Sequence, residues 1–294
     1  MTSTPADAPA YLTVKELAQL LRIKERKVYD LASSGQLPVS RATGKLLFPA
    51  NEVRAFIDGA RGQPAAPPPR PPILLGSHDP LLDWALRESG CGLAAWFDGS
   101  EDGLARFAAG GGVAAALHIH DAVRGEWNVP AVTRECSGMN AVLLGVATRR
   151  RGFVVRPGAR RPADFGDLKE LRLVPRQNGA GTEILFDHLA KAAGLEVEGL
   201  DRAATARTET DAAQAVARAE ADVTFGLEAV ARSYGLDFVP VIEERFDLLV
   251  DRAAWFSGPM QTFAAFCHSP CFAARAADLG GYEVSGFGAV RWNA

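Results

Sequence analysis

A run of prolines constrains this chain most, because no packed helix or strand can pass through it. Residues 60–72 read ARGQPAAPPPRPP, and consecutive prolines lack backbone N–H donors and favour polyproline II. We therefore expect a semi-rigid linker over residues 60–72. It divides the 294-residue chain into domains over residues 1–59 and 73–294, sizes that suit one small module and one larger, two-lobed domain.

Charge is distributed unevenly along the chain. The whole sequence has a formal net charge of −3, but residues 11–58 contain eight Lys or Arg against five Asp or Glu, so that segment carries +3 and the remainder −6. An anionic remainder discourages the large domain from adhering to DNA. The sequence therefore assigns any nucleic-acid contact to the N-terminal module.

Signals for secretion and membrane insertion are missing from the sequence. The first ten residues lack a basic stretch followed by an apolar core, and no run of eighteen apolar residues occurs. We expect a cytoplasmic protein with no membrane partner. Its cysteines are expected to be reduced thiols and not a disulfide framework: Cys91, Cys136, Cys267 and Cys271.

Two short helices are predicted in the N-terminal module. Thr13 and Glu16 have the spacing of a capping box, so the first helix is expected to start at Val14. A second helix is expected over about residues 24–33, before Gly35, a residue type that is common just after a helix end. Two short helices at this spacing are typical of a helix-turn-helix.

A hairpin with a basic tip is predicted next. Residues 37–39 and 46–48 have the pattern of two strands joined by a turn over 41–45, and a third short helix opens within residues 49–53. The segments YLTVKELAQLLRIKERKVYDLASSGQLP and GKLLFPANEVRAFI resemble the excisionase or MerR-type winged helix-turn-helix family.

This resemblance implies a DNA-binding surface. In that family the second helix enters the major groove and the wing contacts the phosphate backbone, which implies DNA contacts for Lys24, Arg26, Lys27, Tyr29, Arg41 and Lys45. Asp30 stands where relatives often carry a basic or aromatic residue. Two alternatives remain open: Tyr29 as a packing residue, and a module that contacts a protein in place of DNA.

Beyond the linker, apolar strand-like runs alternate with helical patterns, beginning with a strand at residues 73–76. This rhythm predicts an α/β sheet of parallel strands. Turns at residues 76–79, 98–103 and 177–182 each precede a predicted helix. Their free backbone N–H groups, at the positive end of a helix dipole, suit a negatively charged or strongly polar ligand.

Several stretches resemble a type II periplasmic-binding-protein-like domain, of the sort attached to DNA-binding modules or to molybdopterin-biosynthesis proteins and related to molybdate binders. They are GSHDPLLDWAL, GSEDGLARFAAG, ALHIHD, RGFVVRPGARRPADFGDLKELRLVPRQNGAGTEILFDHL, AVARAEADVTFGLEAVARSYGLDFVPVIEERFDLLV and GYEVSGFGAVRW. They span nearly all of residues 73–294. The expected fold class is therefore α/β, with a small winged helix-turn-helix domain and a two-lobed domain of this type.

The resemblance also implies a ligand held between the lobes, with Ser77 and Ser100 on one lobe and the turn at residues 178–182 on the other. The third turn of such domains usually reads Gly-Ser-Gly-Thr, and here Ala180 replaces the serine, which removes a hydroxyl and keeps a backbone donor. The expected ligand-binding residues are Ser77, His78, Ser100, His118, Asn178, Gly179, Ala180, Gly181 and Thr182.

Two clusters carry metal-binding residue types. His118 and His120, with Asp121, would point to one side of a strand and could hold a metal. The simpler interpretation is preferred, in which one of these side chains is a polar residue lining the cleft and another lies at its solvent edge. The segment 267–271 has two cysteines and a histidine but no second cluster. No metal site is therefore expected. The charge run at residues 149–151 is interpreted as solvated, with a contact to DNA or to an acidic ligand tail as the alternative.

Together these patterns favour a ligand-responsive transcriptional regulator and not an enzyme, with DNA as a partner and no cofactor. No nucleophile, base and orienting group can be assembled, and no Gly-x-Ser-x-Gly or phosphate-loop motif occurs. The preferred ligands are oxyanions, molybdate or tungstate foremost. The alternatives are a molybdenum-cofactor intermediate, another organic anion, or an enzyme that uses His118 or Cys136. A homodimer is expected, because one small module normally needs a second copy to bind DNA tightly.

Overall fold

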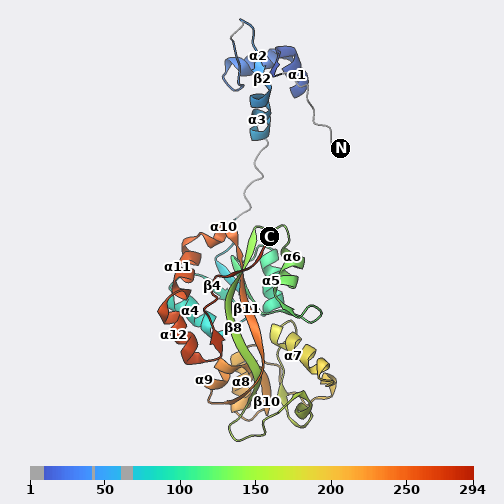
Figure 1. The fold of residues 1–294 in the computed structure, drawn as a ribbon, viewed down its shortest axis with the longest axis vertical. Helices are drawn as coiled ribbons and strands as arrows, with labels where there is room; N and C mark the ends of the chain where they lie inside the picture. Colours follow the sequence, from blue (N-terminus) through green and yellow to red (C-terminus); the bar gives the residue numbers. More distant parts are fainter. Residues whose placement is uncertain (1–9, 42–43, 61–68) are drawn as a thin grey trace. The chain divides into compact units, whose positions relative to one another are not determined.

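The computed structural model describes residues 10–41, 44–60 and 69–294, and the chain divides into two compact units, residues 1–68 and 69–294 (Figure 1). Most of the expected linker lies outside the described residues. Its last part belongs to the larger unit, since the Arg70 guanidinium donates hydrogen bonds to the carbonyls of Phe107 and Gly112. The last helix of the small unit ends at Ala60, one residue beyond the expected boundary.

The small unit has the predicted helix-turn-helix order. The capping box between Thr13 and Glu16 is present and starts the first helix at Val14 as predicted, and Gly35 follows the second helix with a φ of 71°, a conformation that suits glycine. The elements are β1 (Tyr11–Leu12), α1 (Val14–Leu21), α2 (Glu25–Ser33), β2 (Phe48–Pro49) and α3 (Ala50–Ala60).

A small apolar core holds these helices together. Leu17 of α1, Val28 of α2 and Val53 of α3 are fully buried, and Leu37 and Phe48 complete the cluster. The expected wing is reduced to one antiparallel bridge between Ser40 and Leu47, while β2 pairs with β1. Residues 42 and 43, at the expected basic tip, lie outside the described residues.

Within its described residues the larger unit contains a nine-stranded sheet in the order β4-β3-β5-β11-β8-β10-β9, with β12 and β13 also on β8. The expectation of a parallel sheet is wrong in its centre: β3 is parallel to β4 and β5, and β10 to β9, but β8 and β11 run antiparallel to each other and to their other neighbours. The strands are β3 (Ile73–Gly76), β4 (Ala94–Trp96), β5 (Ala114–Leu117), β8 (Ala141–Val155), β9 (Leu173–Val174), β10 (Val223–Leu227), β11 (Asp237–Asp251), β12 (Tyr282–Glu283) and β13 (Val290–Asn293).

The strands β8 and β11 connect two lobes. Each has 15 residues: β8 pairs with β13 towards one end and with β10 at the other, and β11 pairs with β5 at its lobe 1 end. Figure 1 shows this pair running through both halves of the unit. We call the half with β3, β4 and β5 lobe 1 and the half with β9 and β10 lobe 2. A separate β6 (His120–Asp121) and β7 (Glu126–Trp127) form a small hairpin.

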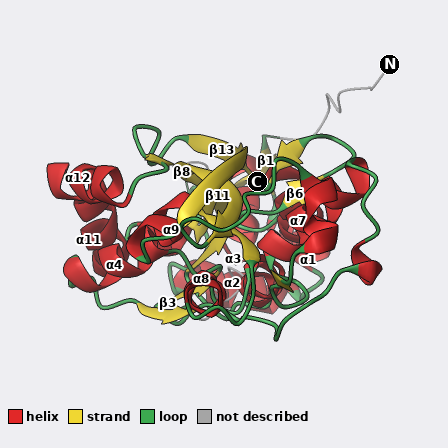
Figure 2. Ribbon diagram, turned by 90° about the horizontal axis from the view of Figure 1, so that it is seen from below, coloured by secondary structure: helices red, strands yellow, loops and turns green. Residues whose placement is uncertain are grey.

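Helices cover both faces of the sheet in each lobe. In Figure 2, α4, α11 and α12 lie on one side of β8 and β11, and α7 lies on the other. No helix in the described ranges is long and apolar enough to cross a membrane. The helices are α4 (Pro80–Glu88), α5 (Ser100–Ala108), α6 (Val129–Cys136), η1 (Phe165–Glu170), α7 (Gly181–Ala192), η2 (Val197–Gly199), α8 (Glu209–Ala217), α9 (Glu228–Ser233), α10 (Arg252–Trp255), α11 (Gly258–Cys267) and α12 (Pro270–Leu279).

Each lobe has its own apolar core. In lobe 1, Phe246 and Phe263 pack under α4, α11 and α12, and Phe107 and Leu117 pack under α5 and α6. In lobe 2, the rings of Phe153, Phe165, Phe186 and Phe225 pack together. The two lobes are joined by β8 and β11, and Ala229 of α9 in lobe 2 also packs into the lobe 1 cluster.

Candidate functional site

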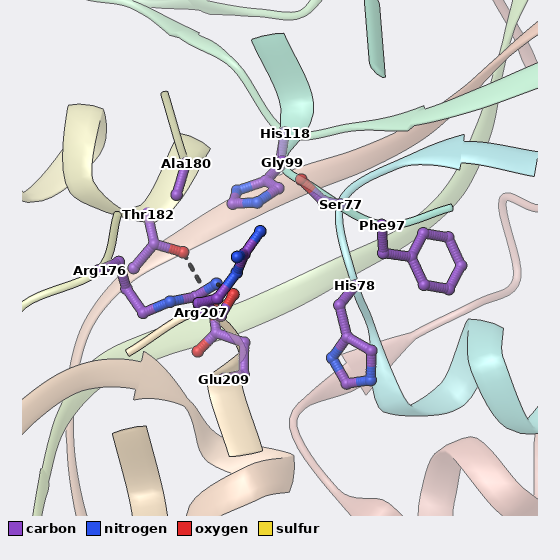
Figure 3. A pocket seen from close by; sticks show the side chains of 10 residues that line it. All are labelled: Ser77, His78, Phe97, Gly99, His118, Arg176, Ala180, Thr182, Arg207 and Glu209. Atoms are coloured by element: carbon purple, nitrogen blue, oxygen red, sulfur yellow. Dashed lines mark hydrogen bonds and ion pairs between the residues drawn. The ribbon is translucent and has the colours of Figure 1, made fainter. Parts of the chain in front are cut away.

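A small cavity lies between the two lobes (Figure 3). Its volume is ≈ 10 Å³, room for about one water molecule, so the lobes are nearly closed on each other. Lobe 1 contributes residues from the ends of β3, β4 and β5, and lobe 2 contributes residues from the starts of α7 and α8. The lining residues are Ser77, His78, Phe97, Gly99, His118, Arg176, Ala180, Thr182, Arg207 and Glu209.

Ser77 offers the cavity a hydroxyl that a second serine orients. The Oγ atoms of Ser77 and Ser100 are 2.7 Å apart, and the Ser100 Oγ accepts a hydrogen bond from the His118 N–H at 3.1 Å. Either hydroxyl of this pair can be the donor; in the arrangement in which the fully buried Ser100 donates, Ser77 is its acceptor. The Ser77 hydroxyl is then free to donate into the cavity.

The turn before α7 brings lobe 2 against His118. A Cβ atom on Gly181 would lie 2.7 Å from the His118 carbonyl oxygen and 2.9 Å from its ring Cε1, so only glycine allows this approach. The backbone N–H groups of Gly181 and Thr182, in the first turn of α7, have no intrahelical acceptor. They stand at the positive end of that helix, beside the cavity.

The expected ligand-binding residues divide into two groups. Ser77, His78, His118, Ala180 and Thr182 line the cavity. Asn178 is exposed, and the remaining three lie beside the cavity and not on its lining: Ser100 beneath Ser77, Gly179 near Gly99, and Gly181 against His118.

One ion pair and one hydrogen bond join the two lobes beside the cavity. The Arg207 guanidinium of lobe 2 lies 2.8 Å from the Asp98 carboxylate of lobe 1, and the Gln177 side chain donates a hydrogen bond of 3.2 Å to the Asp98 carbonyl. Arg207 is itself 75% exposed. These contacts would break if the lobes separated, so they belong to the closed form.

The sequence suggested that the charge run at residues 149–151 is solvated. In the structure this is true only of its middle member, Arg150. Arg149 and Arg151 point to one face of β8 and are buried, whereas Arg150 is exposed and pairs with Glu228. The buried pair surrounds Glu244 of β11, which is opposite Arg149 in the strand register. Arg151 donates two hydrogen bonds to Glu244, of 2.8 and 2.9 Å.

This buried network extends into both lobes. On the lobe 1 side, Arg149 pairs with Asp79 at 2.8 Å, the residue that caps α4. On the lobe 2 side, Arg151 pairs with Glu209 at 2.9 Å, and Arg176 reaches the same carboxylate at 3.1 Å. Because the charges are balanced and buried, loss of one member leaves another without its counter-charge.

The network fixes the protonation states in the cavity. Burial lowers the pKa of His118 despite the nearby Glu244, so its imidazole is neutral at pH 7. Burial alone would raise the pKa of Glu209, but the charges of Arg151 and Arg176 outweigh it and hold this pKa at about 2. For Glu244, the charges of Arg149 and Arg151 outweigh burial and hold the pKa well below its usual range.

These shifts predict acid sensitivity. Because burial lowers the pKa of His118 from 6.5, an unfolded histidine takes up a proton at a higher pH than folded His118 does. An unfolded glutamate takes up a proton below about pH 4.5, while Glu209 stays ionised to about pH 2. Since the unfolded state binds more protons, stability is full above pH 6.5 and falls as the pH drops. Urea unfolding followed by tryptophan fluorescence at pH 7 to 3 measures this, and a flat profile would contradict it.

Within the described residues, His118 and His120 do not share one site, and no three His, Cys, Asp or Glu side chains are grouped so that they could hold a metal ion. His118 binds Glu244, whereas His120 belongs to the separate β6 and packs against Trp127 and His188. Cys136 is buried in the core under α6, away from the cavity lining. Cys267 is buried at the end of α11, while Cys271 is exposed in α12.

The expected DNA-contacting residues lie at the surface of the small unit. Lys24 precedes α2, and Arg26, Lys27 and Tyr29 lie on it. All of them are exposed, as are Arg41 and Lys45 on either side of the expected wing tip. Tyr29 is 51% exposed, which favours a contact residue over a packing residue. The exposed start of α2 therefore carries a basic surface of the kind that binds phosphates.

Sequence reasoning missed four lining residues, and it included Gly99 only as part of the turn at residues 98–103. The four are Phe97, Arg176, Arg207 and Glu209. One signal for Glu209 was present. Thr208 and Asp211 form a capping box, so the start of α8 could have been recognised from its S/T-x-x-D/E pattern. Nothing in the sequence indicated that this helix start faces the same cavity as α7.

Comparisons with known proteins agree with this architecture. Residues 11–61 match the model of a helix-turn-helix domain, and residues 84–268 match the model of the PBP superfamily domain. YvgK of Bacillus subtilis (strain 168), an uncharacterised protein, is 26% identical over 304 residues that span 95% of this chain and 96% of that protein.

Solved structures share the fold of the larger unit. A putative phosphate transporter substrate-binding protein from Clostridium perfringens, with bound phosphate, has a TM-score of 0.52 at 10% identity and covers 72% of this chain and 98% of its own. The sulfate-binding protein SubI from Mycobacterium tuberculosis H37Rv has a TM-score of 0.51 at 13% identity and covers 72% and 86%. At these identities the likeness shows a two-lobed binding-protein fold.

Proposed function

The chain belongs to the PBP superfamily, and from that premise we propose that it is a ligand-responsive transcriptional regulator, in which closure of the two lobes over a small anion changes DNA binding. One observation carries this proposal: a helix-turn-helix unit with an exposed basic second helix is joined in one chain to a two-lobed unit with a cavity between its lobes. An enzyme is disfavoured, because the carboxylate at the cavity, Glu209, is held by Arg151 and Arg176 and no nucleophile, base and orienting group are combined there among the described residues.

The proposed ligand is a compact tetrahedral oxyanion, which is larger than the present cavity of ≈ 10 Å³ and therefore requires the lobes to stand slightly further apart when it is bound. The Ser77 hydroxyl, the N–H groups at the start of α7 and the Arg207 guanidinium are donors of the kind that hold such anions. The likeness to phosphate- and sulfate-binding proteins concerns the fold alone, so the ligand class rests on these donors. Molybdate and tungstate are the first candidates by resemblance, and a molybdenum-cofactor intermediate or another organic anion is the alternative.

We expect the signal to pass through a homodimer. Two copies of the small unit would contact two half-sites on DNA, and a change in lobe closure would alter their spacing. Ligand binding can shift the equilibrium between the open and closed lobes only as far as the ligand binds the closed form more tightly than the open form.

The test is a mobility-shift assay with the full chain and DNA from upstream of its own gene, with and without oxyanions. Binding at low salt that changes when an oxyanion is added is expected. The same ligand should raise the melting temperature, because a ligand that binds only the folded form stabilises it. Failure to bind any upstream fragment at low salt would contradict the DNA-binding role.

Substitutions on α2 test the DNA surface directly. Lys24→Gln and Lys27→Gln are each expected to weaken binding to all DNA sequences by a similar factor. Each should also make the fall of the logarithm of the association constant with the logarithm of the salt concentration shallower by about 1, because each removes one phosphate contact. Lys169→Gln, an exposed lysine of the larger unit, serves as the control and should leave both quantities unchanged. Unaltered slopes for both α2 variants would point to a protein partner.

A further inference from the structure

The hairpin of β6 and β7 reaches from lobe 1 to lobe 2 outside the cavity lining, and Figure 2 shows β6 beside α7. Asn128, the residue after β7, is fully buried and anchors the base of the hairpin in lobe 1. Its side chain accepts a hydrogen bond of 2.6 Å from the Ile119 N–H and donates one of 2.7 Å to Asp247 of β11. The hairpin is therefore expected to move with lobe 1.

Ring contacts join this hairpin to lobe 2. The Trp127 side chain packs against the apolar core of lobe 2. The centroid of the His120 ring lies 4.8 Å from that of Trp127 and 5.2 Å from that of His188, a residue of α7. We call the contacts among Trp127, His120 and His188 the hairpin latch. Because His188 and the core of lobe 2 belong to the other lobe, the latch exists only when the lobes are close together.

The hairpin latch disfavours a proton on His120. Burial lowers the pKa of this imidazole and the neighbouring His188 lowers it further, whereas Asp121 raises it. The Nδ1 atom of His120 is buried and has no hydrogen-bond partner among the described residues. An imidazolium carries a proton on both ring nitrogens, so it would leave one buried N–H without an acceptor. The closed latch therefore accommodates the neutral ring.

The charged groups around the ring do little to offset this cost. Asp121 is the carboxylate that acts on His120, and it already accepts hydrogen bonds from the N–H groups of Val123 and Arg124. The other charged side chains of the hairpin and of the adjoining part of α7 are exposed to solvent: Arg124, Glu126, Asp187 and Lys191. A positive charge on His120 would thus face His188 across the lobes without a dedicated counter-charge.

We infer that the hairpin latch makes lobe closure sensitive to pH: it holds the lobes together while its rings are neutral and releases them when His120 takes up a proton. In the open form His120 leaves α7 and becomes more exposed, so its pKa returns towards the ordinary value of 6.5. Because the open form takes up the proton at a higher pH, a fall in pH below about 6.5 favours the open form. The inference rests on the lobe movement of the proposed function, but not on DNA or on any ligand.

Spin labels on the two lobes test this on the full chain without a ligand. Cys271, in α12 of lobe 1, is the exposed one of the four cysteines, and Lys169→Cys places a second label on η1 of lobe 2. The ratio of open to closed molecules should rise about three- to tenfold between pH 7.5 and pH 5.5, since a proton bound only in the open form shifts this ratio by up to about tenfold per pH unit below the ordinary pKa. An unchanged or falling ratio would overturn the inference.

His120→Phe provides the second arm. Phenylalanine keeps a ring on Trp127 but takes up no proton, and it loses no hydrogen bond at Nδ1, so the ratio should change by less than about twofold over the same range. His188→Phe should give an intermediate response, because His120 stays buried and titratable. His268→Phe is the matched control, because His268 packs on Phe287 within lobe 1, and it should keep the full response.

A folded His120→Phe variant with the wild-type response would contradict the role of the latch and would assign the response to another group, such as His118 of the cavity. NMR titration of the His120 ring in the wild-type chain does not depend on any variant. The pKa of this ring should lie below 6.5, and a value of 6.5 or above would also overturn the inference.

The outcomes separate the two proposals. If the distance between the labels responds to pH as expected while no oxyanion binds and no DNA is bound, the latch stands and the proposed regulator fails. If an oxyanion changes this distance at pH 7.5 and alters DNA binding while a fall in pH leaves the distance unchanged, the regulator stands and the latch fails.

Discussion

Replacement of Arg151 by methionine is expected to lower the free energy of unfolding of the larger unit by about 3–5 kcal/mol, the usual cost of removing one member of a buried ion pair. Arg151 is fully buried and binds both Glu244 and Glu209. Methionine fills a similar volume but leaves these carboxylates short of positive charge. All five tryptophans lie between residues 84 and 292, so their fluorescence during urea unfolding reports on the larger unit alone.

The neighbouring arginine provides the control for this experiment. Arg150 precedes Arg151 on the same strand, but its side chain is 49% exposed and pairs with Glu228. Exposed ion pairs contribute little to stability, so Arg150→Met should cost no more than about 1 kcal/mol. If both variants lose the same free energy of unfolding, burial of Arg151 does not determine how much it contributes to stability.

The small unit could be predicted closely from the sequence because its signals are local. A capping box between Thr13 and Glu16 and a glycine after the second helix act within one or two turns of chain. The start of α2 was predicted within one residue. The wing was predicted less well, since a hairpin register depends on pairing between strands, and here only Ser40 and Leu47 form a bridge among the described residues.

The cavity could be predicted only in part. Turns before helices are visible in the sequence, and two of the three, at Ser77 and Thr182, contribute hydroxyl side chains to its lining. The buried network was not predictable, because Arg149 meets Glu244 through the register of two strands far apart in the sequence. Alternation alone places Arg149 and Arg151 on one face of a strand, but it does not say which face is buried.

The direction of the central strands was missed for a related reason. Apolar runs alternating with helices favour parallel strands, and this holds for β3, β4 and β5. The pattern does not distinguish a strand that ends within one lobe from one that continues into the next. The 15-residue β8 contains the charged run 149–151, which looks like a break in an apolar strand, but the strand continues through it with Arg149 and Arg151 buried.

Gly181→Ala is expected to weaken oxyanion binding at least about tenfold, because the apparent Kd rises as the closed form becomes less populated. The added Cβ would meet the His118 carbonyl oxygen at 2.7 Å, a backbone atom that cannot move aside. The lobes would have to stay apart at this point. Alanine suits the first turn of a helix, and each lobe keeps its own core, so the chain should still fold.

Calorimetric titration with the oxyanion that binds the wild type most tightly measures this loss, and the thermal shift given by the same ligand should shrink with it. Gly199→Ala is the matched control, because a Cβ on Gly199 meets no atom within 4 Å and the residue lies in η2 of the same lobe. It should leave affinity unchanged. If Gly181→Ala binds as tightly as the wild type, ligand binding does not require the close approach of α7 to His118, and signalling by lobe closure would lose its structural basis.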